Sequence, residues 1–198
     1  TIALLPDDIL YQHIVVGIQK GNDELLKEVN QFISQYRADG TYKQMYLRWI
    51  AEEPQPMPEI PVPNSPTRKL RVGTDGVTAP MSYYGEDGTL TGFDIEFVKR
   101  LALSLNAEVE LSVLTFEAMI PALETGKLDL IVASLNTTEE RKERLLLSDD
   151  YIESAISVLI KKELMGIPEP SRQVVTTIQD LHNKKIGVIS GTTADKYV

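Results

Sequence analysis

The residues from Ala133 to Arg141 include the side chains best suited to bind a small charged molecule. An apolar strand is predicted to end at Ser134, hydroxyl and amide side chains follow, and Arg141 lies one helical turn beyond Thr138. Thr138 is of a type that caps helices, which places Arg141 at the third helical position. Ligands of open α/β sheets bind beyond the carboxyl ends of strands, where a guanidinium can hold a carboxylate through two hydrogen bonds.

The same arginine has two other interpretations. Lys142, Glu143 and Arg144 adjoin it, as in a charged and solvated helix face. Residue types and spacing alone do not decide between a ligand contact and such a surface position. A purely structural module is the third interpretation, and it would hold if an internal carboxylate occupied Arg141.

The sequence lacks the side-chain sets of common catalytic and metal sites. It has no cysteine, which excludes a disulfide scaffold, a thiolate metal site and a cysteine nucleophile. His13 and His182 are the only histidines, and neither has a neighbouring ligand set or nucleophile. Adjacent acids are expected to be solvated and not to form a glycosidase pair: Glu139–Glu140 and Asp149–Asp150. Neither a metal nor a cofactor is expected.

A loop rich in glycine and hydroxyl groups runs from Gly187 to Thr193, between a predicted strand and a predicted helix. It lacks the lysine and the glycine spacing of a phosphate-binding loop, so nucleotide binding is not indicated. Backbone N–H groups and hydroxyls at a helix N-terminus still suit an anion or a dipole.

Composition describes a folded, acidic protein. Among the 198 residues, 20 Lys and Arg stand against 29 Asp and Glu, giving a net charge of −9, and 42% of residues are hydrophobic. Those values exclude wholesale disorder and argue against a nucleic-acid or anionic-membrane partner. No apolar run approaches the ~20 residues needed to cross a bilayer. Because the chain starts at Thr1 without a signal-peptide pattern, we expect it to be a part of a larger protein.

Six of the eleven prolines lie between residues 53 and 67, where they prevent both a helix and a central strand. This stretch is predicted to be an extended spacer. A domain boundary is favoured over a surface loop, because loops longer than ~12–15 residues are uncommon inside compact domains.

The elements on the two sides of the spacer differ in kind. Before it, a strand at 13–18 and helices starting near residues 23 and 41 are too few to bury their own apolar stripes, so this segment must dock on another. After it, strands and helices alternate as in an α/β sheet. The strands are predicted at 70–74, 82–84, 90–93, 109–114, 128–132, 155–160 and 186–190, and the helices at 93–106, 116–125 and 177–181.

Several sequence runs resemble a known family. Residues from about Leu70 to Val198 resemble the amino-terminal part of type-2 periplasmic solute-binding proteins of the polar amino acid class. Residues before the spacer resemble the carboxyl-terminal end of the same family. The matching runs are 70–75, 88–96, 120–129, 138–141 and 148–151 for the amino-terminal part, and 16–26, 38–42 and Trp49 for the carboxyl-terminal end.

In this sequence the segment that resembles the family's carboxyl-terminal end (the tail) comes first, the spacer follows, and the segment that resembles its amino-terminal part (the head) comes last. This order suggests an excerpt from tandem binding domains, with a permuted single domain as the alternative. The resemblance implies an α/β, periplasmic-binding-protein-like type 2 fold, mainly one lobe with a mixed sheet flanked by helices, and an incomplete second lobe. The expected domains are the end of a first domain at 1–52, a linker at 53–67, lobe 1 of a second domain at 68–162, and the hinge and start of lobe 2 at 163–198. Head and tail build one lobe in this family, so we expect 8–52 to pack on 68–160, within one chain or by segment exchange between two.

The resemblance also implies how a ligand carboxylate would be held. Arg141 would bind the α-carboxylate, aided by backbone groups near Ser134 and Asn136. Thr192 and Thr193 would close on it from lobe 2, although Thr192 could equally be only an N-cap.

Three further positions would meet the rest of the ligand. Asp75 would face its amino or basic end, and Phe116 would stack on its side chain. Where the family often has a stacking aromatic before Ala-Pro, this sequence has Thr78, which points to weaker or different side-chain recognition. Phe116 as a core residue and Asp75 as a turn cap beside Gly76 remain open alternatives.

The function implied is the non-catalytic capture of an amino-acid-like solute, in the periplasm or outside the cell, with membrane tethering through parts beyond this chain. Partners would be a membrane permease for ABC-type import, a receptor or a fused module, and no nucleic acid. The alternatives are the sensing domain of a sensor kinase, or an enzyme of the same fold such as a dehydratase or a peptidoglycan-cleaving protein.

Overall fold

The computed structural model describes residues 2–4, 10–51, 55–156, 159–161, 177–188, 190 and 192–193. The chain divides into two compact units, one of residues 14–151 and one that combines 1–13 with 152–198. Each unit is described by itself below.

A mixed five-stranded sheet forms the centre of the 14–151 unit. Its strand order is β7 (Ala107–Val113), β3 (Arg68–Thr74), β8 (Leu130–Ile131), β2 (Leu10–Ile18) and β9 (Leu146–Ile156). Strand β3 runs parallel to β7 and β8, whereas β2 pairs antiparallel with β8. The predicted α/β class with a mixed sheet is therefore confirmed.

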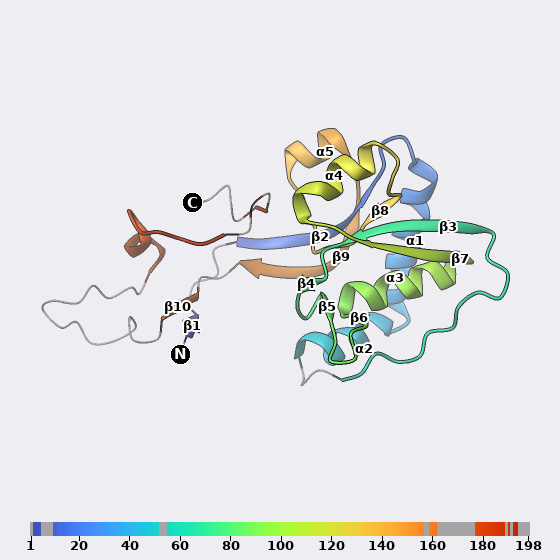
Figure 1. The fold of residues 1–198 in the computed structure, drawn as a ribbon, viewed down its shortest axis with the longest axis horizontal. Coiled ribbons are helices and arrows are strands. Elements are labelled where there is room, and N and C mark those ends of the chain that lie inside the picture. Colours follow the sequence, from blue (N-terminus) through green and yellow to red (C-terminus); the bar gives the residue numbers. More distant parts are fainter. Residues whose placement is uncertain are drawn as a thin grey trace, which may run out of the picture. The chain divides into compact units, whose positions relative to one another are not determined.

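Helices cover both faces of this sheet. On one face lie α1 (Asp23–Ala38) and α3 (Phe93–Ser104), and on the other lie α4 (Phe116–Glu124) and α5 (Glu139–Arg144) (Figure 1). Helix α2 (Thr41–Tyr46) continues into the π-helical turn η1 (Leu47–Ala51) and packs near α3. A small antiparallel sheet of β4 (Val77–Thr78), β5 (Ser82–Tyr84) and β6 (Leu90–Thr91) leads into α3.

Local sequence signals set the ends of α1. The Asn22 side chain accepts a hydrogen bond from the Leu25 amide at 3.3 Å, which satisfies one of the unpaired N–H groups of the first turn. Gly40 follows the helix with φ of +86°, a left-handed conformation that favours glycine. Both features agree with the sequence-based prediction.

The segment before the spacer contributes to the same core as the segment after it. Strand β2 lies between β8 and β9, and the Phe32 ring meets Phe97 of α3 at 5.4 Å between centroids. The apolar stripe of α1 is buried: Leu25, Val29, Phe32, Ile33 and Tyr36. The assignment of residues 1–52 to a preceding domain stays a prediction. Between the two segments, the described residues 55–67 contain neither helix nor strand.

Two predicted strands need correction. The strand predicted at 155–160 corresponds to parts of two strands: residues 155–156 end β9, which already begins at Leu146, and residues 159–160 belong to β10 (Leu159–Lys161). Residues 157–158 lie outside the described residues. The polar residues at the start of β9 do not give an apolar strand pattern. They are tolerated because β9 is an edge strand, with Ser148 and Tyr151 buried and Asp149 exposed between them.

The strand predicted at 186–190 is absent from the described residues there, which are 186–188 and 190. A strand needs a neighbour for its ladder of hydrogen bonds, and no described segment pairs with these residues.

The unit that combines residues 1–13 with 152–198 also contains two short strands and one helical turn. Strands β1 (Ile2–Leu4) and β10 (Leu159–Lys161) pair antiparallel. The helix predicted near 177–181 is the 3₁₀ turn η3 (Ile178–Leu181), which Thr177 and Asp180 close as a capping box.

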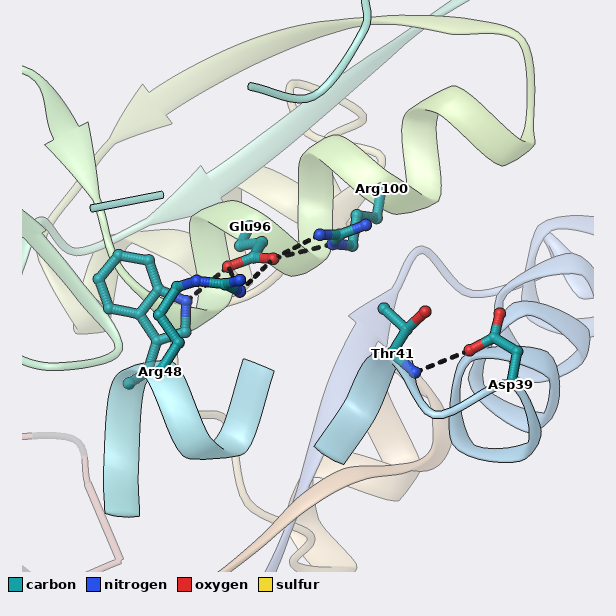
Figure 2. Close-up of polar contacts among 6 residues, drawn as sticks. Asp39, Thr41, Arg48, Glu96 and Arg100 are labelled. Carbon is teal, nitrogen blue, oxygen red and sulfur yellow. Dashed lines mark hydrogen bonds and ion pairs between the residues drawn. The ribbon is translucent and has the colours of Figure 1, made fainter. Parts of the chain in front are cut away.

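A buried carboxylate joins α3 to η1. Figure 2 shows Arg48 and Arg100 converging on Glu96, whose side chain is fully buried. Its oxygens accept hydrogen bonds from Arg48 Nη1 at 3.0 Å, Arg100 Nη2 at 2.7 Å and Trp49 Nε1 at 2.7 Å. These donors compensate the cost of burying the charge and fix η1 against α3. Figure 2 also shows the start of α2, where the Thr41 amide donates to Asp39 Oδ1 at 2.8 Å.

We predict that Glu96→Ala lowers the free energy of unfolding by about 3 kcal/mol, because it leaves the partly buried guanidinium groups of Arg48 and Arg100 and the buried Trp49 N–H without their acceptor. Urea denaturation measures this change. The matched control is Glu110→Ala, which removes an exposed carboxylate 3.1 Å from Lys69 Nζ and should change stability far less. Equal losses in the two variants would contradict the prediction.

Candidate functional site

The carboxyl ends of three parallel strands bring the predicted site segments to one edge of the sheet. Phe116 follows β7, Asp75 follows β3, and Ser134 lies three residues beyond β8. Because β7, β3 and β8 are parallel neighbours, their carboxyl ends lie at the same edge. The topology therefore gathers residues that are 59 positions apart in the sequence, from 75 to 134.

Helix α5 begins as the sequence predicts and places Arg141 in its first turn. Thr138 is the N-cap in extended conformation, and its Oγ1 accepts from the Arg141 amide at 3.2 Å. This cap fixes the position of the arginine backbone next to the end of β8.

Arg141 is buried, although it stands in a highly charged helix. Its exposed fraction is 6%, whereas Lys142, Glu143 and Arg144 are exposed. The interpretation as an ordinary surface residue is therefore wrong. Arg141 Nη1 donates to the backbone oxygen of Asn136 at 2.8 Å and also to Asn136 Oδ1, which orients the guanidinium.

Burial acts on the charge of this guanidinium. It lowers the pKa of Arg141 from its ordinary value, and the neighbouring Glu140 carboxylate acts in the opposite direction. An arginine nevertheless stays protonated in a protein, so a cation is kept in a partly desolvated place. An anionic group next to this guanidinium would offset the free-energy cost of partly desolvating its charge.

Phe116 lies next to Arg141. The Arg141 Cζ atom is 5.1 Å from the centroid of the Phe116 ring, within the range of a cation–π contact. The ring is also partly buried against a core cluster on the α4 side of the sheet, which includes Met119, Leu123, Leu135 and Leu145. The core interpretation of Phe116 thus has support, and its stacking on a ligand stays a prediction.

Ser134 has an unusual backbone and an unsatisfied hydroxyl. Its φ is +50°, a left-handed value that costs a non-glycine residue of order 1–3 kcal/mol. Its amide donates to Asp94 Oδ2 at 3.1 Å, while its buried Oγ has no hydrogen-bond partner within the part of the chain that the structure describes. A buried hydroxyl without a partner is a feature of sites that complete their hydrogen bonds with something else.

Asp75 and Thr78 contact each other. Thr78 Oγ1 donates to Asp75 Oδ2, and the Val77 amide donates to Asp75 Oδ1 at 3.3 Å. The interpretation of Asp75 as a turn cap is thereby supported, since its carboxylate bridges the turn through Gly76. Contact of Asp75 or Thr78 with a ligand stays a prediction.

Thr192 and Thr193 belong to the other unit. Thr193 is 7% exposed, and its hydroxyl accepts from Gln12 Nε2 at 2.7 Å. The helix expected after them falls outside the described residues. Their closure on a ligand stays a prediction.

Asp94 is a buried acid to which the sequence reasoning gave no role. Its side chain is fully buried in the first turn of α3, and it accepts from the Ser134 amide and from Tyr151 Oη at 2.7 Å. Desolvation raises its pKa to about 7; the Asp75 charge adds to this rise, and hydrogen bonding by Tyr151 and by Ser134 opposes it. The sequence feature that could have indicated a buried acid is the alternation of acidic and apolar residues from Phe93 to Phe97.

The described residues contain neither a cluster of metal-binding side chains nor a membrane-spanning helix. None of their His, Asp or Glu side chains form a group of three or more that could hold a metal ion. No helix in the described ranges combines the length and the apolar character required to cross a membrane.

Comparisons with known proteins point to one family. Residues 70–189 match the model of the bacterial extracellular solute-binding proteins, family 3. The chain is 33% identical over 129 residues to the L-cystine-binding protein TcyJ of Escherichia coli K12, covering 65% of this chain and 46% of that protein. It is 29% identical over 130 residues to the histidine-binding periplasmic protein of Salmonella typhimurium LT2, covering 66% and 47%. The chain thus spans about half the length of these curated relatives.

Two solved structures are similar to this chain over a shorter stretch. An ancestral arginine-binding protein bound to arginine is 42% identical, with a TM-score of 0.38, over 38% of this chain and 34% of that one. The L-cystine solute receptor of Neisseria gonorrhoeae in its open form is 31% identical, with a TM-score of 0.38, over 41% and 34%.

We predict that Asp94 makes stability fall as the pH rises from about 4 to about 7. In that range the folded protein holds a proton on Asp94, because its pKa is about 7, whereas the unfolded chain has lost it near the ordinary value of 3.8. Each pH unit then removes at most about 1.4 kcal/mol from the free energy of unfolding.

The measurement is urea denaturation of the wild type and Asp94→Asn between pH 4.5 and 8. The stability of the wild type minus that of the variant should decline up to about pH 7 and stay flat above it. Parallel curves for the two proteins would contradict the raised pKa.

Proposed function

Because this chain belongs to family 3 of the bacterial extracellular solute-binding proteins, we propose that it binds an amino acid or a similar small carboxylate solute outside the cytoplasm. The proposal includes no catalytic step, and the relatives described above are named as binding proteins. The α/β fold with a mixed sheet flanked by helices is the one expected for this family.

The observation that carries the proposal is the buried guanidinium of Arg141 at the carboxyl edge of the sheet. Asn136 orients one of its nitrogens, and the Phe116 ring lies 5.1 Å from its Cζ. Charge-assisted hydrogen bonds from a fixed, desolvated guanidinium to a carboxylate are among the strong ones.

A second charge fits the other end of an amino acid. Asp75 follows β3, the strand next to β8, and its carboxylate is held by Thr78 and the Val77 amide. A fixed anion directly after β3 and a fixed cation on α5, the helix that follows β8, match a zwitterion better than a simple anion. The α-amino group or a basic side chain of the ligand would meet Asp75.

The relatives suggest which amino acids to test first. Their names state binding of L-cystine, histidine and arginine. Phe116 would stack on the ligand side chain, and Thr78 would leave the opposite side without a second ring. Thr192 and Thr193 would contact the carboxylate when the lobes close.

We also propose the wider context that the family implies. A membrane permease for ABC-type import is the favoured partner, with a receptor or a fused sensor module as the other possibility, and the place of action is the periplasm or the cell exterior. Residues 1–52 would be the end of a preceding binding domain, and 68–162 lobe 1 of the next. In that arrangement the packing of 14–51 on the sheet would occur in one chain or by exchange between two.

The test is a thermal-shift screen of the full-length protein, with a complete second lobe, against L-cystine, L-histidine and L-arginine; residues 1–198 alone should bind weakly or not at all. We expect at least one of them to raise the melting temperature, and Arg141→Ala to abolish the shift. Arg141→Lys should weaken it, because an ammonium cannot form the two-pronged contact.

Arg144→Ala is the matched control. It removes a cation from the same helix, one that pairs with Glu124 at 2.7 Å on the surface. The ligand-induced shift should survive in this variant. Absence of a shift with all three amino acids in the wild type, or an unchanged shift in Arg141→Ala, would refute the carboxylate contact.

A further inference from the structure

Asp94 connects the first turn of α3 to the turn that carries the site. Its side chain is fully buried, and its two oxygens are bonded to different partners. Oδ2 accepts from the Ser134 amide at 3.1 Å, and Oδ1 accepts from Tyr151 Oη at 2.7 Å. One carboxylate therefore ties together α3, the segment after β8, and β9.

The position of Asp94 is itself firmly fixed. The amides of Phe93 and Asp94 donate to the backbone oxygens of Pro80 and Met81 at 3.0 and 2.8 Å. Gly92 precedes them, and a Cβ at this residue would lie 2.2 Å from the Met81 oxygen, so the close approach requires glycine. The carboxylate is thus presented from a rigid point of the fold.

The Ser134 turn depends on an acceptor at this point. Its left-handed φ of +50° is unfavourable for serine and needs support from its surroundings. The supported residue stands directly beside the site, because Asn136, two residues later, orients Arg141. A shift of the turn would therefore displace both the Ser134 backbone and the oxygen that holds the guanidinium.

We propose that Asp94 is a positioning residue of the ligand site, which holds the Ser134 turn in its binding conformation through the hydrogen bond to the Ser134 amide. This inference rests on the proposed function, since the turn matters for binding only if a ligand is bound there. Asp94 acts through Ser134 and does not touch the ligand.

Hydrogen bonding, and not charge, is the basis of this role. An asparagine at position 94 has an oxygen that accepts from the Ser134 amide and an NH₂ group that donates to Tyr151 Oη. The raised pKa of Asp94, about 7, agrees with a site that also accommodates the neutral acid. The conservative variant should therefore preserve the turn, while loss of the acceptor should release it.

The first experiment needs no ligand. Amide hydrogen exchange in the full chain is followed by NMR for Ser134 and for Val132, whose amide donates to the Gly73 oxygen at 3.0 Å and serves as internal reference. We expect Asp94→Ala to raise the Ser134 rate relative to Val132 by about tenfold or more. Asp94→Asn should leave that ratio near the wild-type value, since it keeps an acceptor for the Ser134 amide. Tyr151→Phe should change the ratio less than Asp94→Ala, because the hydrogen bond between Asp94 and Ser134 remains. An unchanged ratio in Asp94→Ala overturns the inference.

The second experiment measures affinity by calorimetry with L-cystine, L-histidine and L-arginine. Asp94→Ala should weaken binding by about tenfold or more, and Asp94→Asn and Tyr151→Phe by less than about threefold. Tyr151→Phe is the matched control, because it removes the other bond to the same carboxylate. Equal losses in Asp94→Ala and Tyr151→Phe would indicate general destabilisation and overturn the positioning role.

Failure of a variant to fold and failure of the proposed function can both be told apart from failure of the positioning role. If Asp94→Ala does not fold, the double variant Asp94→Ala with Tyr151→Phe replaces it, because removal of both partners leaves fewer buried polar groups unsatisfied. If the wild type binds none of the three amino acids, the proposed function fails together with the ligand part of this inference. The exchange experiment then still decides whether Asp94 holds the Ser134 turn.

Discussion

The fold of the 14–151 unit depends on two carboxylates buried in the first turn of α3. Asp94 and Glu96 are two positions apart on a helix, so they point in nearly opposite directions. Asp94 meets the Ser134 amide and Tyr151 on the sheet side, and Glu96 meets Arg48, Trp49 and Arg100 on the helix side. Each of these buried acids would be costly without its donors, and all of the donors except Arg100 come from elements far from α3 in the sequence. The helix is thereby held between two layers in one orientation.

The sheet determines where a ligand can be held. Parallel pairing of β7, β3 and β8 places the segments after all three strands at one edge, and the cap at Thr138 fixes Arg141 beside them. Asn136, which follows β8, therefore orients the guanidinium. Phe116, the apolar neighbour of the guanidinium, comes from the segment after a different strand, β7. A cation with several structural restraints is better prepared for a carboxylate than a mobile surface arginine, because less conformational entropy is lost on binding.

Sequence patterns predicted the features that depend on neighbouring residues. Asn22, Gly40 and Thr138 mark helix ends through local backbone chemistry, and the apolar stripe of α1 follows from helical periodicity. The features that failed depend on distant partners. The polar start of β9 is a strand only because β2 lies beside it, and residues 186–188 have no pairing partner among the described segments. The burial of Arg141 and the two partners of Asp94 likewise arise from tertiary packing, which no local pattern encodes.

The place of β2 has a consequence for how this protein folds. The strand lies inside the sheet between β8 and β9. In the sequence, however, β2 precedes the proline-rich stretch, whereas β8 and β9 follow it. The Val16 amide of β2 donates to Ser148 Oγ, 132 residues later. Such pairings of high contact order form late, because a long loop must close before any contact compensates the lost entropy. On the ribosome, the sheet cannot be completed until β9 has emerged. In this arrangement the apolar faces of β2 and α1 meet the strands and helices of the later segment only after β9 has been made. An apolar face that is exposed at that stage is the kind of surface that chaperones protect.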